Sequence, residues 1–207
     1  MDHRGDGEAA AAAAESMTPP PPNFIVGIGG SAGGLPAYVS FLEALSIHTG
    51  MAFVIVYHFP PTAKSQLANI LSKHTKMPVL DVSTAMHIQA DHVYVCPPNS
   101  DIFIEGNTFR VATPRVKGNT QVDVLFSSLA LAMGHRAIGI IFSGYCGDGA
   151  EGCRVIKAKG GTNFAQDQSA EVSSMPQSAQ QTGCVDFVLS PEKIAERLLK
   201  LAKGDVL

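Results

Sequence analysis

Three stretches of the chain are almost continuously apolar, and each is followed by a polar or glycine-rich segment. They are Phe24–Ile28, Met51–Tyr57 and Ala137–Phe142. Runs of this length are typical of strands that are buried on both faces of a sheet. Between the first two runs, Leu35–Leu45 carries apolar residues at helical spacing. A helix between two buried strands predicts that these strands are parallel.

The same alternation of strands and helices continues towards the C-terminus. Apolar positions from Val122 to Met133 repeat at helical spacing, and Ser190-Pro191 is a typical helix start with Ser190 at the N-cap. Further helices are expected over residues 64–73, 150–158 and 176–182, and further strands over 162–165 and 185–189. The pattern predicts an α/β fold, with a doubly wound, mostly parallel sheet and helices on both faces.

The middle of the chain departs from this alternation. His92–Cys96 and Asp101–Ile104 have the composition of short strands, and the intervening Pro97–Ser100 is typical of a turn. A second turn at Asn107 precedes Thr108–Val111. We therefore expect a small antiparallel hairpin excursion at the edge of the sheet.

The N-terminal segment differs in composition from the rest. Residues 1–23 contain an alanine run followed by four prolines, which is typical of a disordered tail or linker, so we expect the folded domain over residues 24–203. Acidic residues precede the alanines, unlike a signal peptide, and no apolar run reaches the roughly 20 residues that cross a bilayer. The net charge of -3 favours neither nucleic acid nor an anionic membrane surface. We expect a cytoplasmic protein without direct membrane insertion.

A reactive side chain lies in the turn after the first predicted strand. Residues 29–34 read GGSAGG, so Ser31 is surrounded by glycines that allow a sharp bend. The N-terminus of the following helix would present free N–H groups to a developing negative charge. Taken alone, a serine at this place is more typical of a helix cap or a phosphate contact.

Two more polar side chains follow buried strands. His58 follows Met51–Tyr57, and Asp148 lies in the glycine-rich loop after Ala137–Phe142. Parallel strands end at one edge of a sheet, so Ser31, His58 and Asp148 are expected at the same edge. There they can act as nucleophile, general base and orienting carboxylate. Taken separately, the histidine is more typical of a hydrogen-bonded structural residue, and the aspartate is an ordinary N-cap for the helix that begins at Ala150.

Two glycine motifs overlap Ser31. Gly27–Ala32 fits the dinucleotide fingerprint G-x-G-x-x-A, but that mechanism needs an acidic residue at the end of the second strand, where this chain has His58. Gly29–Gly33 fits the nucleophile elbow G-x-S-x-G, but in α/β-hydrolases the aspartate precedes the histidine along the chain. Here the histidine comes first. A nucleotide-binding domain remains a weak alternative.

Together these motifs resemble the catalytic domain of the CheB-type chemotaxis receptor methylesterases, a family of protein-glutamate methylesterases. The resemblance extends from about Phe24 to Leu199. It rests on IGGSAGG at Ser31, VYHFPP at His58 and SGYCGDGA at Asp148, together with the intervening HVYVCPPN, VDVLFSS and SSMP.

The resemblance implies a doubly wound Ser-His-Asp hydrolase that takes part in signal transduction. Such enzymes cleave γ-glutamyl methyl esters on the cytoplasmic helices of chemoreceptors, release methanol, and deamidate certain receptor glutamines. By motif, Ser31 is the nucleophile, His58 the base and Asp148 the orienting group. The backbone at Tyr145 lies where the family places an oxyanion donor, and the backbone after the nucleophile adds two candidates, Ala32 and Gly33.

No metal and no cofactor is implied. The nearest cluster of ligand-type side chains, His87, Asp91 and His92, is equally typical of a polar turn. Ala32 stands where many members have threonine, and Tyr145-Cys146 replaces the usual methionine-glycine. No receiver domain is recognised before residue 24, so we expect control by a regulatory or methyltransferase domain, in cis or in trans. The alternative function is a non-catalytic docking module of the same fold, against which the intact serine, histidine and aspartate argue.

Overall fold

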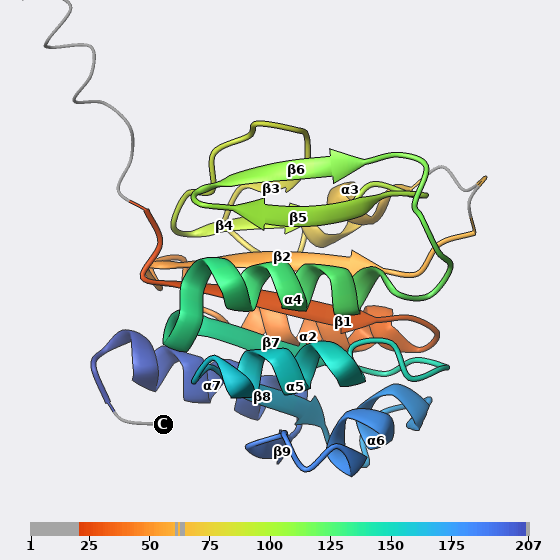
Figure 1. Cartoon of the computed structure of the whole chain (residues 1–207). Helices are drawn as coiled ribbons and strands as arrows, with labels where there is room; N and C mark the ends of the chain where they lie inside the picture. The colour runs from red at the N-terminus through yellow and green to blue at the C-terminus, as the bar shows by residue number, and fades with distance from the viewer. Residues whose placement is uncertain (1–20, 61, 63–64, 206–207) are drawn as a thin grey trace, which may run out of the picture.

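A computed structural model of the chain describes residues 21–60, 62 and 65–205 (Figure 1). Residues 1–20 of the predicted tail lie outside the described residues, so the tail stays a prediction. Just before the first strand, the N–H of Asn23 donates to the carbonyl oxygen of Gly50 at 2.9 Å. None of the helices in the described part of the chain is long and apolar enough to cross a membrane.

A parallel sheet of seven strands forms the centre of the domain (Figure 1). Every neighbouring pair of strands in it is parallel. The order across the sheet is β3 (Val79–Asp81), β4 (His92–Val95), β2 (Met51–Tyr57), β1 (Phe24–Gly30), β7 (Ala137–Ile141), β8 (Thr162–Gln166) and β9 (Phe187–Leu189). The chain winds from β1 to one side and then from β7 to the other, which confirms the predicted doubly wound fold.

Helices cover both faces of this sheet (Figure 1). One face carries α4 (Gln121–Met133), α5 (Ala150–Ala158) and α6 (Ser174–Gln181), and the other α2 (Gly34–Ala44), α3 (Leu67–Leu71) and α7 (Pro191–Ala202). A short 3-10 helix, η2 (Gly134–Arg136), connects α4 to β7. Beside α4 lies a separate antiparallel pair, β5 (Asp101–Glu105) and β6 (Thr108–Ala112).

Alternate side chains of the central strands enter two different cores. In β2, Val54 and Val56 belong to the core under α4 and α5, whereas Phe53 and Ile55 belong to the core under α2 and α7. Successive residues of a strand point to opposite faces, so a strand covered on both sides must be apolar throughout. This explains the continuous apolar runs that the sequence shows.

The middle of the chain corrects one prediction. His92–Cys96 does not pair with Asp101–Ile104; β4 is instead an internal strand of the parallel sheet, between β2 and β3. The antiparallel pair is β5–β6. Its buried Ile102, Ile104 and Phe109 belong to the same core as the α4 side chains, on the same face of the parallel sheet. The edge strand β3 was missed because two of its three residues are exposed, which gives no strand pattern.

The other predicted elements occur with small shifts of their ends. β1 continues two residues beyond Ile28, and β9 begins at Phe187 rather than at Val185. The helix predicted over 64–73 is confined to α3 within the described residues. Ser190 does precede α7, but its side chain makes no capping hydrogen bond to the helix.

Candidate active site

The point where the strand order reverses lies at β1. Strand β1 has β2 on one side and β7 on the other, with Gly30 opposite Tyr57 and Gly29 opposite Ile141. The three strands end together, so the loops that carry Ser31, His58 and Asp148 meet at this edge. Ligands of doubly wound folds bind at such a reversal, beyond the carboxyl ends of the strands.

Backbone hydrogen bonds fix Ser31 between the two neighbouring loops. The N–H of Ser31 donates to the carbonyl oxygen of Ser143 at 2.9 Å, and the N–H of His58 donates to the carbonyl oxygen of Gly30 at 3.4 Å. The N–H of Gly34 closes the turn by donating to the Ser31 carbonyl oxygen at 2.9 Å. Gly33 has a φ of 67°, a left-handed conformation that favours glycine.

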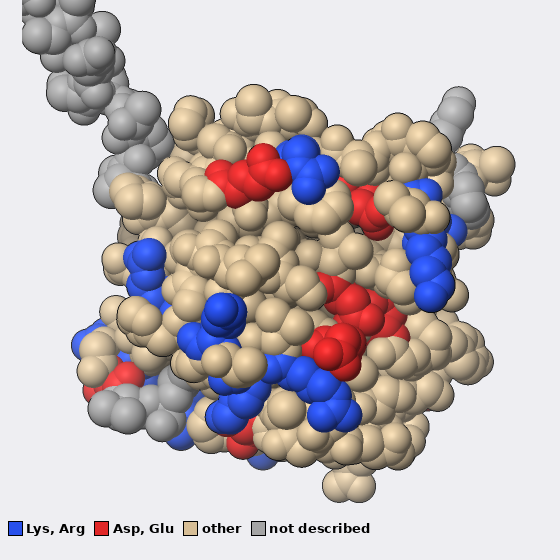
Figure 2. Space-filling model, viewed as in Figure 1, with Lys and Arg blue, Asp and Glu red and all other residues tan. Residues whose placement is uncertain are grey.

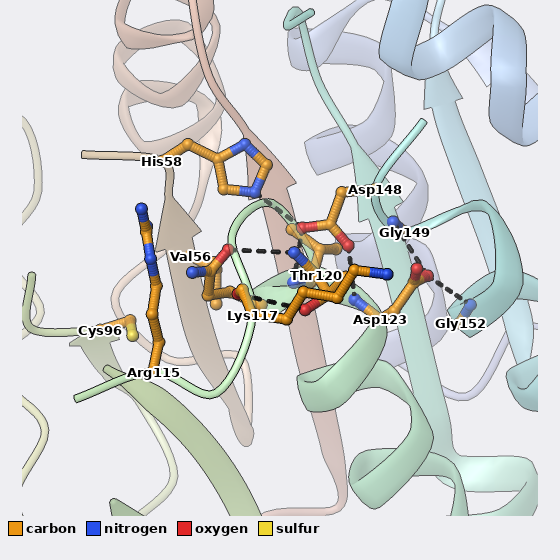
Figure 3. A network of polar contacts seen from close by, with 12 residues as sticks. Val56, His58, Cys96, Arg115, Lys117, Thr120, Asp123, Asp148, Gly149 and Gly152 are labelled. Atoms are coloured by element: carbon orange, nitrogen blue, oxygen red, sulfur yellow. Dashed lines mark hydrogen bonds and ion pairs between the residues drawn. The ribbon is translucent and has the colours of Figure 1, made fainter. Parts of the chain in front are cut away.

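His58 and Asp148 are joined directly. The Nε2 atom of His58 lies 2.7 Å from Oδ2 of Asp148, and both side chains are almost completely buried (Figure 3). Because Nε2 is occupied by the carboxylate, Nδ1 is the ring nitrogen left for another partner. Among the described residues, no hydrogen bond joins the Ser31 hydroxyl to His58. The structure thus pairs the histidine with the aspartate, and it places the serine turn alongside through backbone contacts.

The N-terminus of α4 holds the Asp148 carboxylate in place. The N–H of Val122 donates to Oδ2 and the N–H of Asp123 donates to Oδ1, each at 3.0 Å. A helix N-terminus offers free N–H groups and a partial positive charge, which together stabilise a buried carboxylate. Asp148 therefore caps α4 and does not cap the helix that begins at Ala150.

A second aspartate, which the sequence analysis did not single out, caps that helix instead. Oδ1 of Asp123, in the first turn of α4, accepts the N–H groups of Gly149 at 2.9 Å and Gly152 at 2.7 Å (Figure 3). The loop before α5 thus caps α4, and the first turn of α4 caps α5. An acidic residue within VDVLFSS, at the start of a predicted helix, was the available signal.

Negative charge gathers where these two helices begin. Figure 2 shows acidic side chains over this part of the surface, and the first turns of α4 and α5 supply Asp123 and Glu151. Burial raises the pKa of Asp123, and the nearby charges of Asp148 and Glu151 add to this, whereas the N–H groups of Gly152 and Gly149 act to lower it. The Asp148 carboxylate is therefore one of the charges that raise the pKa of Asp123.

The predicted oxyanion donors lie in the turns on either side of Ser31. Within the described residues, the backbone N–H groups of Ala32, Gly33 and Tyr145 donate to no protein acceptor. The two turns lie close together at Gly144, since a Cβ added there would be 3.0 Å from the Cβ of Ser31. The side chain of Tyr145 itself points outward and is exposed.

In the described part of the chain, no group of three His, Cys, Asp or Glu side chains is close enough to hold a metal ion. Of the cluster noted in the sequence, Asp91 accepts the N–H groups of Thr49 and Gly50 through Oδ1, at 2.7 and 2.8 Å. Its role is to hold the backbone before β2.

Comparison with known proteins gives a family match over most of the chain. Residues 26–198 match the family described as CheB methylesterase. A curated protein of Leptospira interrogans serovar copenhageni is 34% identical over 183 residues, which are 86% of this chain and 95% of that protein. The protein-glutamate methylesterase/protein-glutamine glutaminase of Trichodesmium erythraeum is 32% identical over 183 residues, 85% of this chain but 52% of that protein. This chain therefore spans about half of the latter relative.

Solved structures agree with the sequence match. The crystal structure of the Thermotoga maritima CheB methylesterase catalytic domain aligns with a TM-score of 0.79 at 26% sequence identity, covering 86% of this chain and 98% of that one. The fold and the length of the match agree with the resemblance seen in the sequence. The chain belongs to the CheB methylesterase family.

Proposed function

We propose that this domain hydrolyses γ-glutamyl methyl esters on the cytoplasmic helices of chemoreceptors, with Ser31 as nucleophile, His58 as general base and Asp148 as orienting carboxylate. The observation that carries the proposal is the buried 2.7 Å contact between His58 Nε2 and Asp148 Oδ2, beside the Ser31 turn at the reversal of the sheet. Family membership and the names of the relatives support the reaction class.

The first half-reaction transfers the glutamyl group to the protein. The Nδ1 atom of His58 accepts the hydroxyl proton of Ser31 while Oγ attacks the ester carbonyl carbon. Backbone N–H groups of Ala32, Gly33 and Tyr145 stabilise the negative charge that develops on the carbonyl oxygen. The bond to the methoxy oxygen then breaks, methanol leaves with the proton from His58, and a glutamyl ester remains on Ser31.

The second half-reaction restores the serine. Water attacks the glutamyl ester while His58 takes one of its protons, and the Ser31 oxygen leaves with that proton. The product is a free γ-carboxyl group. A glutamine side chain would follow the same course with ammonia as the leaving group, which is the second activity in the names of several relatives.

Asp148 contributes through charge and geometry. It holds the ring of His58 so that Nδ1 is the basic nitrogen, and it stabilises the imidazolium that forms after proton transfer. The N–H groups of Val122 and Asp123 donate to this carboxylate and fix its position. We further propose that a regulatory or methyltransferase domain, in cis or in trans, controls access to this site.

The experiment that tests this function is methanol release from a methylated cytoplasmic fragment of a chemoreceptor. Ser31→Ala should lower turnover at least about 10³-fold, because the nucleophile is lost. Its unfolding free energy should stay within about 1 kcal/mol of the parent protein, because only one hydroxyl is removed. Ser46→Ala, which removes an exposed hydroxyl remote from Ser31, is the matched control and should keep full turnover.

Two results would contradict the proposal. Turnover by Ser31→Ala at the parent rate would remove Ser31 as nucleophile. Absence of methanol release by the parent protein, together with saturable binding of the receptor fragment, would favour the docking module of the same fold.

A further inference from the structure

The two predicted oxyanion turns have one structural feature in common. In each, the peptide carbonyl that precedes the candidate N–H group accepts a hydrogen bond from the protein. The carbonyl oxygen of Ala32 accepts from the Ser143 hydroxyl at 2.8 Å, and the carbonyl oxygen of Gly144 accepts from the N–H of Met175 at 2.9 Å. In a trans peptide the C=O and the following N–H point in opposite directions. Fixing these carbonyls therefore fixes the direction of the N–H groups of Gly33 and Tyr145.

Ser143 makes four hydrogen bonds around these turns, two through its hydroxyl and two through its backbone. Its hydroxyl donates to Ala32 and accepts the N–H of Val172 at 2.9 Å. Its own carbonyl oxygen accepts the N–H of Ser31, and its N–H donates to Oε1 of Gln166, both at 2.9 Å. The residue has no exposed surface, and these hydrogen bonds satisfy each of its polar atoms within the protein.

The segment Val172–Met175, which contains most of the SSMP motif, completes the arrangement. The carbonyl oxygen of Val172 accepts the N–H of Gly144 at 2.9 Å, while the N–H of Met175 donates to the Gly144 carbonyl oxygen. Gly144 is thus held from both sides. A Cβ there would lie 2.2 Å from the Met175 Sδ, so the close approach depends on glycine.

We propose that Ser143 is a positioning residue for the oxyanion site. Its hydroxyl links the turn after the nucleophile to the Val172–Met175 segment, and that segment fixes the peptide before Tyr145. One buried serine thereby holds both sets of backbone donors in a fixed relation to Ser31. This inference rests on the proposed function, because it assumes that Ser31 is the nucleophile and that these N–H groups face the oxyanion. Donors that are fixed in advance stabilise a transition state without reorganising during the reaction.

Two variants separate this role from a merely structural one. Ser143→Ala removes the hydroxyl and leaves the Ala32 carbonyl and the Val172 N–H without their partner. Ser143→Thr keeps the hydroxyl. Ser128→Ala is the matched control, since the hydroxyl of Ser128 also donates to a carbonyl, that of Leu125, and accepts a backbone N–H, that of Ile104, but lies between α4 and β5.

The measurement is the rate constant for covalent labelling of Ser31 by a fluorophosphonate, together with kcat and KM for methanol release. In labelling, the Oγ–phosphorus bond forms, the phosphorus–fluorine bond breaks, and His58 takes the serine proton, so fluoride leaves and the oxyanion site holds the phosphoryl oxygen. Ser143→Ala should lower both the labelling rate constant and kcat about 10- to 100-fold, with KM within about twofold. Ser143→Thr should stay within about threefold of the parent, and Ser128→Ala should match it.

The labelled fraction distinguishes loss of folding from loss of positioning. A structural defect lowers the fraction of protein that can be labelled, whereas a positioning defect lowers the rate constant of the fraction that remains. Parent-like rate constants in Ser143→Ala would overturn the proposal for Ser143 alone. Failure of the parent protein both to label and to release methanol would overturn the proposed function and this inference with it. If Ser143→Ala does not fold, Ser143→Cys, of similar volume and with a weaker donor, should show the same slower labelling, and a parent-like rate in it overturns the proposal.

Discussion

Strand β2 has a histidine–aspartate pair at each end, and the two pairs differ in almost every physical respect. After the strand, His58 and Asp148 are 2.7 Å apart, with side chains 7% and 0% exposed. Before it, His48 and Asp91 are 3.8 Å apart, with side chains 83% and 29% exposed. In both pairs the carboxylate accepts backbone N–H groups, so anchoring of the aspartate does not distinguish them.

The difference lies in the histidine and in the solvent around it. An exposed pair at 3.8 Å is screened by water and contributes little, whereas a buried pair in contact interacts through a low dielectric. The presence of a surface cavity does not identify the site either. A cavity of about 480 Å³ lies between α2 and the segment after α3, remote from Ser31, and is lined by Leu42, Glu43, Lys73 and their neighbours. Burial of charge at the strand reversal marks the candidate site, and cavity size does not.

The largest expected contrast comes from changing the two histidines in the same way. His58→Gln should lower methanol release by about 10²- to 10⁴-fold, because the general base is lost. His48→Gln should leave turnover within about twofold, since its side chain is mostly in water. Turnover of both variants on a methylated receptor fragment checks this. An equal loss of turnover in the two variants would show that the buried pair has no special role.

The two aspartates give the next contrast. Asp148→Asn should lower kcat about 10²-fold or more, because an amide cannot stabilise the imidazolium of His58. Asp91→Asn should leave kcat unchanged and lower the unfolding free energy by about 1 kcal/mol, because hydrogen bonds to Thr49 and Gly50 weaken. Steady-state kinetics and urea unfolding on both proteins separate the effects. A loss of kcat in Asp91→Asn would show that the N-terminal end of β2 is coupled to the site.

The third contrast concerns Asp123, which caps α5 while Asp148 caps α4. Asp123→Ala leaves the N–H groups of Gly149 and Gly152 without their acceptor and should cost about 1–2 kcal/mol of unfolding free energy. Glu151→Ala, in the exposed first turn of α5, should cost less than about 0.5 kcal/mol. Thermal or urea unfolding measures both, and equal losses would show that the cap contributes nothing beyond surface charge.

The smallest effect is a pH dependence of stability due to Asp123. Since its pKa is raised above the ordinary 3.8, the folded protein holds this proton more tightly than the unfolded chain does. Its contribution to the unfolding free energy therefore falls as pH rises from 3.8 through the raised pKa. Asp123→Asn should remove that part of the slope in urea unfolding between about pH 3.5 and 7. An unchanged slope in the variant would mean that Asp123 titrates normally.

The sequence could be interpreted correctly wherever one strand or one helix carries its own pattern. The runs that became β1, β2 and β7 are apolar throughout because both faces of each strand are covered, and that property is visible residue by residue. β3 was missed because an edge strand with exposed Leu80 and Asp81 lacks this signal. The partner of β4 was wrong because pairing depends on distant segments, and local composition does not encode them.

For the site, the motif order places Ser31, His58 and Asp148 after three parallel strands, and that was enough to expect them at one edge. Their catalytic roles remain predictions. What the linear order could not reveal is which groups satisfy Asp148, because its donors lie 25 and 26 residues earlier in the chain. For the same reason Ser143, bonded to Ala32 across 111 residues, was not recognisable as part of the site.

Local patterning therefore specifies the buried strands, the helices between them and the edge on which the reactive side chains lie. The folded structure decides the partners: which helix N-terminus stabilises which carboxylate, which ring nitrogen of His58 stays free, and which carbonyls orient the backbone donors. The physical reason is range. Hydrophobic periodicity acts between neighbours along the chain, whereas hydrogen bonds and burial act between atoms that only folding brings within about 3 Å of each other.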